Sequence, residues 1–88
     1  MESLTICIPR VGVSVTSEFI RGVFAKCNIG YINRVDVVKG EKTSKAFIHF
    51  RGWFGSTRAK EVKEKLLRGE YIYVVYDPPW FWRCSKRR

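Results

Sequence analysis

The segment Lys-Ala-Phe-Ile-His-Phe at residues 45–50 has the alternation of a half-buried β-strand. Successive side chains of a strand point to opposite faces of the sheet. The apolar face of this strand, which we expect to join the core, carries Ala46, Ile48 and Phe50. The opposite face carries Lys45, Phe47 and His49. The strand therefore offers one face to a core and the other to solvent.

Outward from this strand, three more strands and two helices are predicted. Apolar residues at alternating positions predict strands at residues 4–8, 31–38 and 71–76. One helix is predicted between an N-cap at Thr16 and a stop at Asn28, and another between Ser56 or Thr57 and Gly69. With right-handed crossovers, this order predicts an α+β, ferredoxin-like β-α-β-β-α-β sandwich. Its four-stranded antiparallel sheet has the strand order fourth, first, third, second, with two helices on one face.

Positive charge dominates the composition. The 88 residues, enough for one domain, include 17 Lys and Arg against 8 Asp and Glu, a formal net charge of +9. Such a field attracts polyanions, mostly nucleic acid, although a merely solubilising surface has the same composition. Three widely spaced cysteines and one histidine predict reduced thiols, and neither a metal site nor a cofactor. Without a membrane-length apolar run or a signal peptide, the chain is expected to be intracellular, in the nucleus or the cytoplasm.

Residues 4–76 resemble an RNA-recognition motif (RRM). Ile-Cys-Ile-Pro-Arg-Val at residues 6–11 matches the short hexamer of that family, and Thr-Ser-Lys-Ala-Phe-Ile-His-Phe at residues 43–50 matches its octamer. The resemblance implies binding of single-stranded RNA, with three aromatic rings of the sheet stacked on bases. Cys7 and Lys45 replace two of these rings, and Phe47 retains the third. We therefore expect weaker stacking than in the family, by about 1–3 kcal/mol for each lost ring.

The resemblance and the strand alternation together predict a basic, partly aromatic sheet face that binds single-stranded nucleic acid, with RNA favoured over DNA. Phe47 is expected to stack on a base with Tyr73 or His49, while lysines and arginines hold the phosphates. The expected nucleic-acid-binding residues are Thr5, Cys7, Arg34, Lys42, Lys45, Phe47, His49, Tyr73 and Arg83. The alternatives are that the C-terminal segment covers Phe47 and that His49 is an ordinary surface residue.

The C-terminal segment falls outside the RRM pattern, so we expect a domain at residues 1–77 and an aromatic, basic extension at residues 78–88. The extension resembles the tails of small uncharacterised proteins of large DNA viruses, which suggests a viral protein. Its aromatic run either docks on its own domain, stacks on nucleic acid, or anchors a partner protein or a second copy. For this rival function, protein–protein interaction or self-association, the expected contact residues are Trp53, Phe54, Trp80, Phe81 and Trp82.

Catalysis is not expected. Acylphosphatases share the predicted topology, size and basicity, but they depend on a glycine-bearing phosphate loop with an arginine after the first strand. Residues 9–15 contain Arg10 without that loop. A single histidine, which shares its strand face with Lys45 and Phe47, gives no Ser-His-Asp or Cys-His arrangement.

Overall fold

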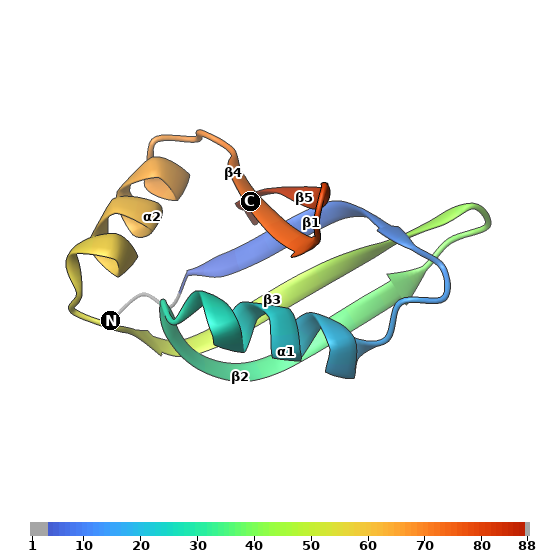
Figure 1. The fold of residues 1–88 in the computed structure, drawn as a ribbon, viewed down its shortest axis with the longest axis horizontal. Helices are drawn as coiled ribbons and strands as arrows, with labels where there is room; N and C mark the ends of the chain where they lie inside the picture. The colour runs from blue at the N-terminus through green and yellow to red at the C-terminus, as the bar shows by residue number, and fades with distance from the viewer. Residues whose placement is uncertain (1–3, 88) are drawn as a thin grey trace.

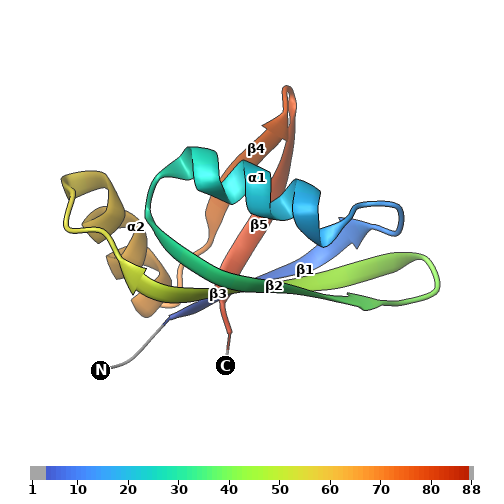
Figure 2. The ribbon, with the colours of Figure 1, turned by 90° about the horizontal axis from the view of Figure 1, so that it is seen from below.

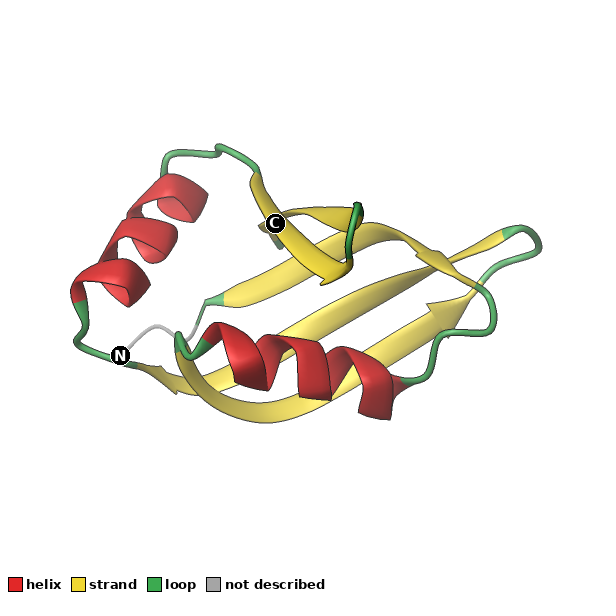
Figure 3. Ribbon diagram, in the orientation of Figure 1, coloured by secondary structure: helices red, strands yellow, loops and turns green. Residues whose placement is uncertain are grey.

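The computed structural model describes residues 4–87 and contains two helices and five strands (Figure 3). Residues 1–3 of the expected domain and residue 88 of the expected extension lie outside the described part. The elements are, in chain order, β1 (Thr5–Gly12), α1 (Ser17–Cys27), β2 (Gly30–Lys39), β3 (Thr43–Trp53), α2 (Thr57–Leu67), β4 (Ile72–Asp77) and β5 (Trp80–Lys86). The predicted α+β class is confirmed, and the C-terminal segment adds a strand to the predicted set.

The added strand changes the order of the sheet. The observed order is β2-β3-β1-β5-β4, and every neighbouring pair is antiparallel. The expectation that the strand at residues 71–76 lies beside the first strand is therefore wrong, because β5 separates β4 from β1. β5 runs parallel to β3, so it has the place and the direction expected of the fourth strand. β4 is left at the edge.

A two-residue turn explains this rearrangement. Only Pro78 and Pro79 separate β4 from β5, and Asp77 is paired with Trp80 across the turn. A loop of two residues makes a tight hairpin. The C-terminal segment therefore folds back along β4, and its far end pairs with β1 through Ile6–Lys86 and Cys7–Ser85.

Both helices lie on one side of the layer formed by β1, β2 and β3 (Figure 2). The β4–β5 hairpin rises from this layer toward the same side. Figure 1 shows α1 in front of the sheet and α2 beside the start of β4. The opposite side of the sheet, which we call the open face, has no helix over it.

The core lies between this sheet and the helices. It contains the inward residues expected from the strand alternation, together with residues of β5: Leu4, Ile6, Ile8, Ala46, Ile48, Phe50, Ile72, Val74, Trp82 and Cys84. From the helices, Ile20, Phe24, Ala59 and Leu66 are buried against them. Apolar spacing along residues 59–67 also favours Leu67 as a core residue, but this side chain is 48% exposed in the last turn of α2.

The helix ends agree with the sequence expectations. The Thr16 hydroxyl accepts a hydrogen bond from the Phe19 amide at 3.1 Å, and the Ser56 hydroxyl accepts one from the Ala59 amide at 3.2 Å. These hydroxyls satisfy amides that have no partner within the first turn of a helix. Asn28 ends α1 with a φ of 56°, and Gly69 follows α2 with a φ of 82°, both in the left-handed region. Within the described residues, neither helix has the length and apolar character needed to cross a membrane.

Candidate nucleic-acid interface

The open face collects side chains from all five strands, at positions that alternate with the buried residues. Phe47, His49 and Lys45 come from β3, where Ala46, Ile48 and Phe50 are buried. Cys7 of β1 pairs with Phe47 on one side and with Ser85 of β5 on the other. The same alternation places these residues on the open face: Thr5, Arg34, Asp36, Tyr73, Val75, Phe81 and Arg83.

The ring of Phe47 is covered by an arginine from the C-terminal segment. The guanidinium carbon of Arg87 lies 4.7 Å from the centre of the ring. The Arg87 amide donates a hydrogen bond of 2.9 Å to the Thr5 carbonyl, which holds the segment beside β1. Arg87 was not among the expected binding residues. The alternation of residues 80–86 is the sequence signal that could have placed Arg87 next to this face.

A second aromatic cluster lies on the outer side of the β4–β5 hairpin. The rings of Tyr73 and Phe81 meet edge to face, with centres 5.4 Å apart and exposed fractions of 60% and 54%. The guanidinium of Arg83 lies 4.6 Å from the centre of the Tyr71 ring. An open hollow of about 690 Å³ adjoins the cluster. It is lined by Pro9, Arg10, Tyr73, Phe81, Trp82 and Arg83.

The two aromatic positions expected to work together are not brought together. Phe47 lies on β3 and Tyr73 on β4, with β1 and β5 between them. Three strand spacings amount to about 14 Å, too far for both rings to contact one base. The structure instead provides two separate aromatic positions, each with an arginine beside it.

His49 is held by hydrogen bonds at both ring nitrogens. Its Nε2 lies 2.9 Å from Asp36 Oδ2, and its Nδ1 lies 3.3 Å from Thr5 Oγ1. With Asp36 ionised, Nε2–H donates to this carboxylate, and Nδ1 shares a hydrogen bond with the Thr5 hydroxyl. The ring links β1, β3 and β2 across the open face. Its nitrogens are therefore engaged with the protein rather than directed at a base.

Asp36 brings a negative charge into this region. Partial desolvation acts to raise the pKa of Asp36, but hydrogen bonds from His49 and Arg34 and the charge of Arg34 outweigh it. The pKa therefore lies below its ordinary value, and the carboxylate stays ionised at neutral pH. Arg34, an expected phosphate contact, donates to Asp36 at 3.2 Å. Its charge is partly neutralised before any phosphate approaches.

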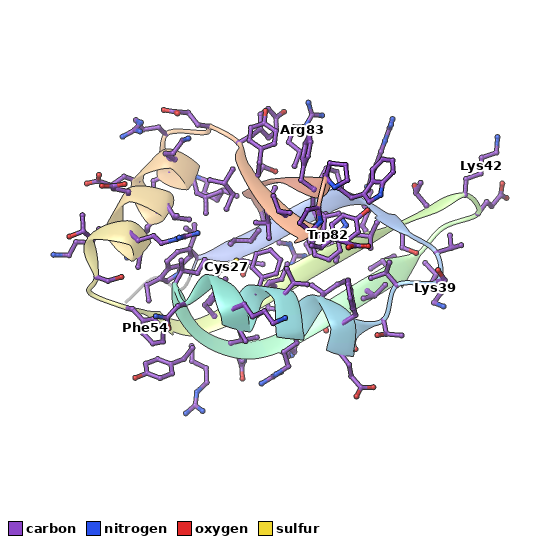
Figure 4. All side chains as sticks on the ribbon, viewed as in Figure 1. Cys27, Lys39, Lys42, Phe54, Trp82 and Arg83 are labelled. Atoms are coloured by element: carbon purple, nitrogen blue, oxygen red, sulfur yellow. The ribbon has the colours of Figure 1, made fainter. Side chains whose placement is uncertain are left out.

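Three of the expected nucleic-acid-binding residues remain: Lys45, Lys42 and Cys7. Lys45 is exposed two residues before Phe47 on the same strand face, where a phosphate contact is geometrically possible. Lys42 lies in the β2–β3 turn, far from the labelled Arg83 (Figure 4). Burial raises the pKa of the Cys7 thiol against the opposing charges of Lys45 and Arg87. This thiol is therefore neutral at neutral pH and fills space between Phe47 and Ser85.

The expected protein-contact aromatics are spread over three environments. Trp82, only 4% exposed, belongs to the core, where its ring stacks on Tyr76 with centres 4.4 Å apart and on Phe24 at 6.4 Å. Trp53 is half-buried against Phe50, with ring centres 4.8 Å apart, because β3 continues to Trp53, beyond the predicted strand at residues 45–50. Phe54 meets Tyr31 edge to face at 4.7 Å. Trp80, which is 63% exposed, lies at the β4–β5 turn together with Phe81. The five residues do not form one patch.

The part of the chain that the structure describes contains no cluster of three side chains able to hold a metal ion. The thiols of Cys7, Cys27 and Cys84 are free. Comparisons with protein-family models, with curated proteins and with solved structures find no match.

Proposed function

We propose that this protein binds single-stranded nucleic acid across its open face, and that it binds RNA in preference to DNA. The observation that carries the proposal is the presence of two aromatic positions on the open face, one half-buried at Phe47 and one exposed at Tyr73 and Phe81, each with an arginine in contact or beside it. Phe47 with Arg87 forms the first position. Tyr73 and Phe81, beside Arg83, form the second. Aromatic platforms beside cations suit bases and phosphates respectively, and require no particular base sequence.

The charge of the open face also suits a polyanion, and the helices carry cations as well as carboxylates. Carboxylates occur on the helices at Glu18, Glu61 and Glu64, on the opposite side of the sheet. On the open face, the Asp36 carboxylate is already paired with Arg34 and His49. A polyanion that approaches the open face therefore meets mainly positive charge.

At the first position, a base has to replace the guanidinium of Arg87 above Phe47. A cation over an aromatic ring contributes about 0.5–1 kcal/mol at an exposed site. Base–aromatic stacking contributes about 1–3 kcal/mol. Stacking therefore prevails, and the displaced guanidinium remains close enough to bind the adjoining phosphate. In this mechanism, Arg87 occupies the ring in the free protein and contacts the backbone of the nucleic acid in the complex.

At the second position, the hollow beside Tyr73 and Phe81 offers space for another base. Arg10 and Arg83 line this hollow and supply cations for the phosphates. The surface bends between the two positions, because the hairpin rises out of the β1–β3 layer (Figure 2). The ligand is therefore a flexible single strand that follows a convex surface, and a stiff duplex does not fit both positions.

Fluorescence anisotropy with a labelled oligouridine, titrated at several salt concentrations, tests the proposal. We expect Phe47→Ala and Phe81→Ala each to weaken binding by about 5- to 150-fold, which corresponds to about 1–3 kcal/mol per stacked base. Tyr31→Ala is the matched control, because this ring is 65% exposed but contacts Phe54 outside both aromatic positions. The proposal is refuted if Phe47→Ala and Phe81→Ala bind as tightly as Tyr31→Ala and the wild type, or if the affinity does not fall as the salt concentration rises. An oligothymidine of equal length distinguishes RNA from DNA.

A protein contact at the hairpin is the competing proposal. Trp80 and Phe81 are adjacent and each more than half exposed, as anchors of an interface often are. Under this alternative, Trp80→Ala abolishes a concentration-dependent association while Phe47→Ala changes nothing. Sedimentation equilibrium of the wild type, Trp80→Ala and Phe47→Ala separates the two functions.

A further inference from the structure

A groove lies on the helix side of the molecule, away from the open face. It has a volume of about 430 Å³ and is bounded by α1, α2 and β4. Its apolar lining comes from Val23, Ile29, Val62, Ile72 and Val74. Cys27, labelled in Figure 4, also lines the groove from the last turn of α1. Hollows of this size with an apolar lining and a few polar groups are typical binding sites.

The unpaired edge of β4 opens into the same groove. β4 is the outermost strand of the sheet and pairs with β5 on one side. Residues 72–76, five in succession, line the groove. Because side chains of a strand alternate, a surface formed by consecutive residues includes the backbone edge of the strand. Amide and carbonyl groups of such an edge are ready to pair with an extended chain.

Two positively charged side chains line the groove. Lys26 of α1 and Arg58 of α2 both line it. Neither forms an ion pair within residues 4–87. The charge of Arg58 also acts on the Cys27 thiol, where it opposes the rise in pKa caused by burial. Both cations are therefore available to an anionic partner.

We propose that this groove binds an extended acidic segment of a partner protein, which adds to β4 as a sixth strand. Its backbone pairs with the β4 edge, an apolar side chain enters the groove, and its carboxylates meet Lys26 and Arg58. The charge argues against a second copy of this chain as the occupant, because each copy carries a net charge of +9. The site lies apart from the open face, so it does not depend on the proposed nucleic-acid binding.

A short fluorescein-labelled peptide that alternates glutamate with isoleucine is a suitable probe. The matched protein variants are the double variant Lys26→Glu/Arg58→Glu and the control double variant Lys60→Glu/Lys65→Glu, which changes the net charge equally at exposed residues outside both the groove and the open face. We expect anisotropy titrations to show at least about tenfold weaker binding for the first variant and less than about twofold for the second. Equal losses indicate non-specific attraction to a basic protein and overturn the proposal.

Two further measurements test the geometry. In a Cys7→Ser background, Cys27 is the reactive thiol, because Cys84 is fully buried. The bound peptide is expected to slow alkylation of Cys27, whereas unchanged alkylation places the peptide elsewhere. A peptide with N-methylated amides retains its charges but cannot form the added strand, so undiminished binding by this peptide overturns strand addition. Sedimentation that shows a dimer in which Cys27 is protected identifies a second copy as the occupant and overturns the proposal.

Discussion

Truncation of Trp82 provides the sharpest test of the fifth strand. The side chain is 4% exposed and stacks between Tyr76 and Phe24. Burial of about 150–250 Å² of tryptophan surface at about 25 cal/mol per Å² contributes about 4–6 kcal/mol. Because an alanine keeps part of that burial and the site partly collapses, Trp82→Ala is expected to lower the free energy of unfolding by about 3–5 kcal/mol.

This loss is large for a domain of this size. Folded domains are stabilised by about 0.05–0.15 kcal/mol per residue, which gives about 4–13 kcal/mol for this chain. Trp80→Ala is the matched control, because Trp80 is two residues earlier on the same strand and 63% exposed. Its effect is expected to stay within about 0.5 kcal/mol.

Urea denaturation followed by far-ultraviolet circular dichroism measures both variants without relying on tryptophan fluorescence. Trp82→Phe, which keeps an aromatic ring in the core, is expected to fall between them. If Trp82→Ala and Trp80→Ala differ by less than about 1 kcal/mol, residues 80–86 do not form a core strand. The result then favours a four-stranded domain with an extension.

Four further predictions concern other parts of the fold. Gly22→Ala is expected to stabilise the protein by about 0.5–1 kcal/mol, because Gly22 lies inside α1 with nothing within 4 Å of an added Cβ. Gly30→Ala is expected to destabilise it, because the new Cβ would lie 2.6 Å from a backbone carbonyl oxygen of β3; thermal melts of both variants check the two signs. Burial raises the pKa of Cys84 to about 12, so mass spectrometry after iodoacetamide treatment near neutral pH is expected to find this thiol unmodified until urea is added. Because the pKa of Asp36 is lower in the folded state, ionised Asp36 stabilises the fold above the unfolded pKa of about 3.9. This stabilisation is lost as the pH falls through the folded pKa. The wild type is therefore expected to have a higher Tm than Asp36→Asn at neutral pH, and the difference in Tm is expected to vanish in acid.

The elements with local signals were predicted well. Thr16 and Ser56 cap the helices as expected, since a hydroxyl that accepts from an amide three residues later depends only on neighbouring residues. The inward residues of β1 and β3 were also correct, because alternation fixes which side chains share a face. The predicted ends of the strands were less accurate. β3 runs from Thr43 to Trp53, whereas the alternation indicated a strand at residues 45–50.

The predictions for the C-terminal segment were incomplete for a physical reason. Its alternation, with Trp82 and Cys84 inward and Arg83 outward, is present in the sequence. Two prolines before it are typical of the end of a strand, but here they form a two-residue turn between two strands. The three consecutive aromatics Trp80, Phe81 and Trp82 also obscure the alternation, because the sequence does not distinguish an exposed aromatic residue from a buried one.

In the candidate site, too, the local features were predicted and the contacts between distant segments were not. The sequence identified Phe47 and Lys45 as neighbours on one strand face, and both lie on the open face. It did not identify the contact between Phe47 and Arg87, which joins residues 40 positions apart. It also placed Tyr73 beside β1, where β5 lies instead. Such contacts depend on which strands pair, and strand pairing is a property of distant segments.

By itself, the sequence determined the charge, the α+β class, the helix caps and the two faces of each strand. These properties arise from composition and from interactions within a few residues. Only the tertiary structure decided that the C-terminal segment is a strand between β1 and β4, that Trp82 belongs to the core, and that Arg87 covers Phe47. The physical reason is that β-pairing and aromatic packing gain their free energy from segments far apart in the chain, and local patterns do not specify the partner.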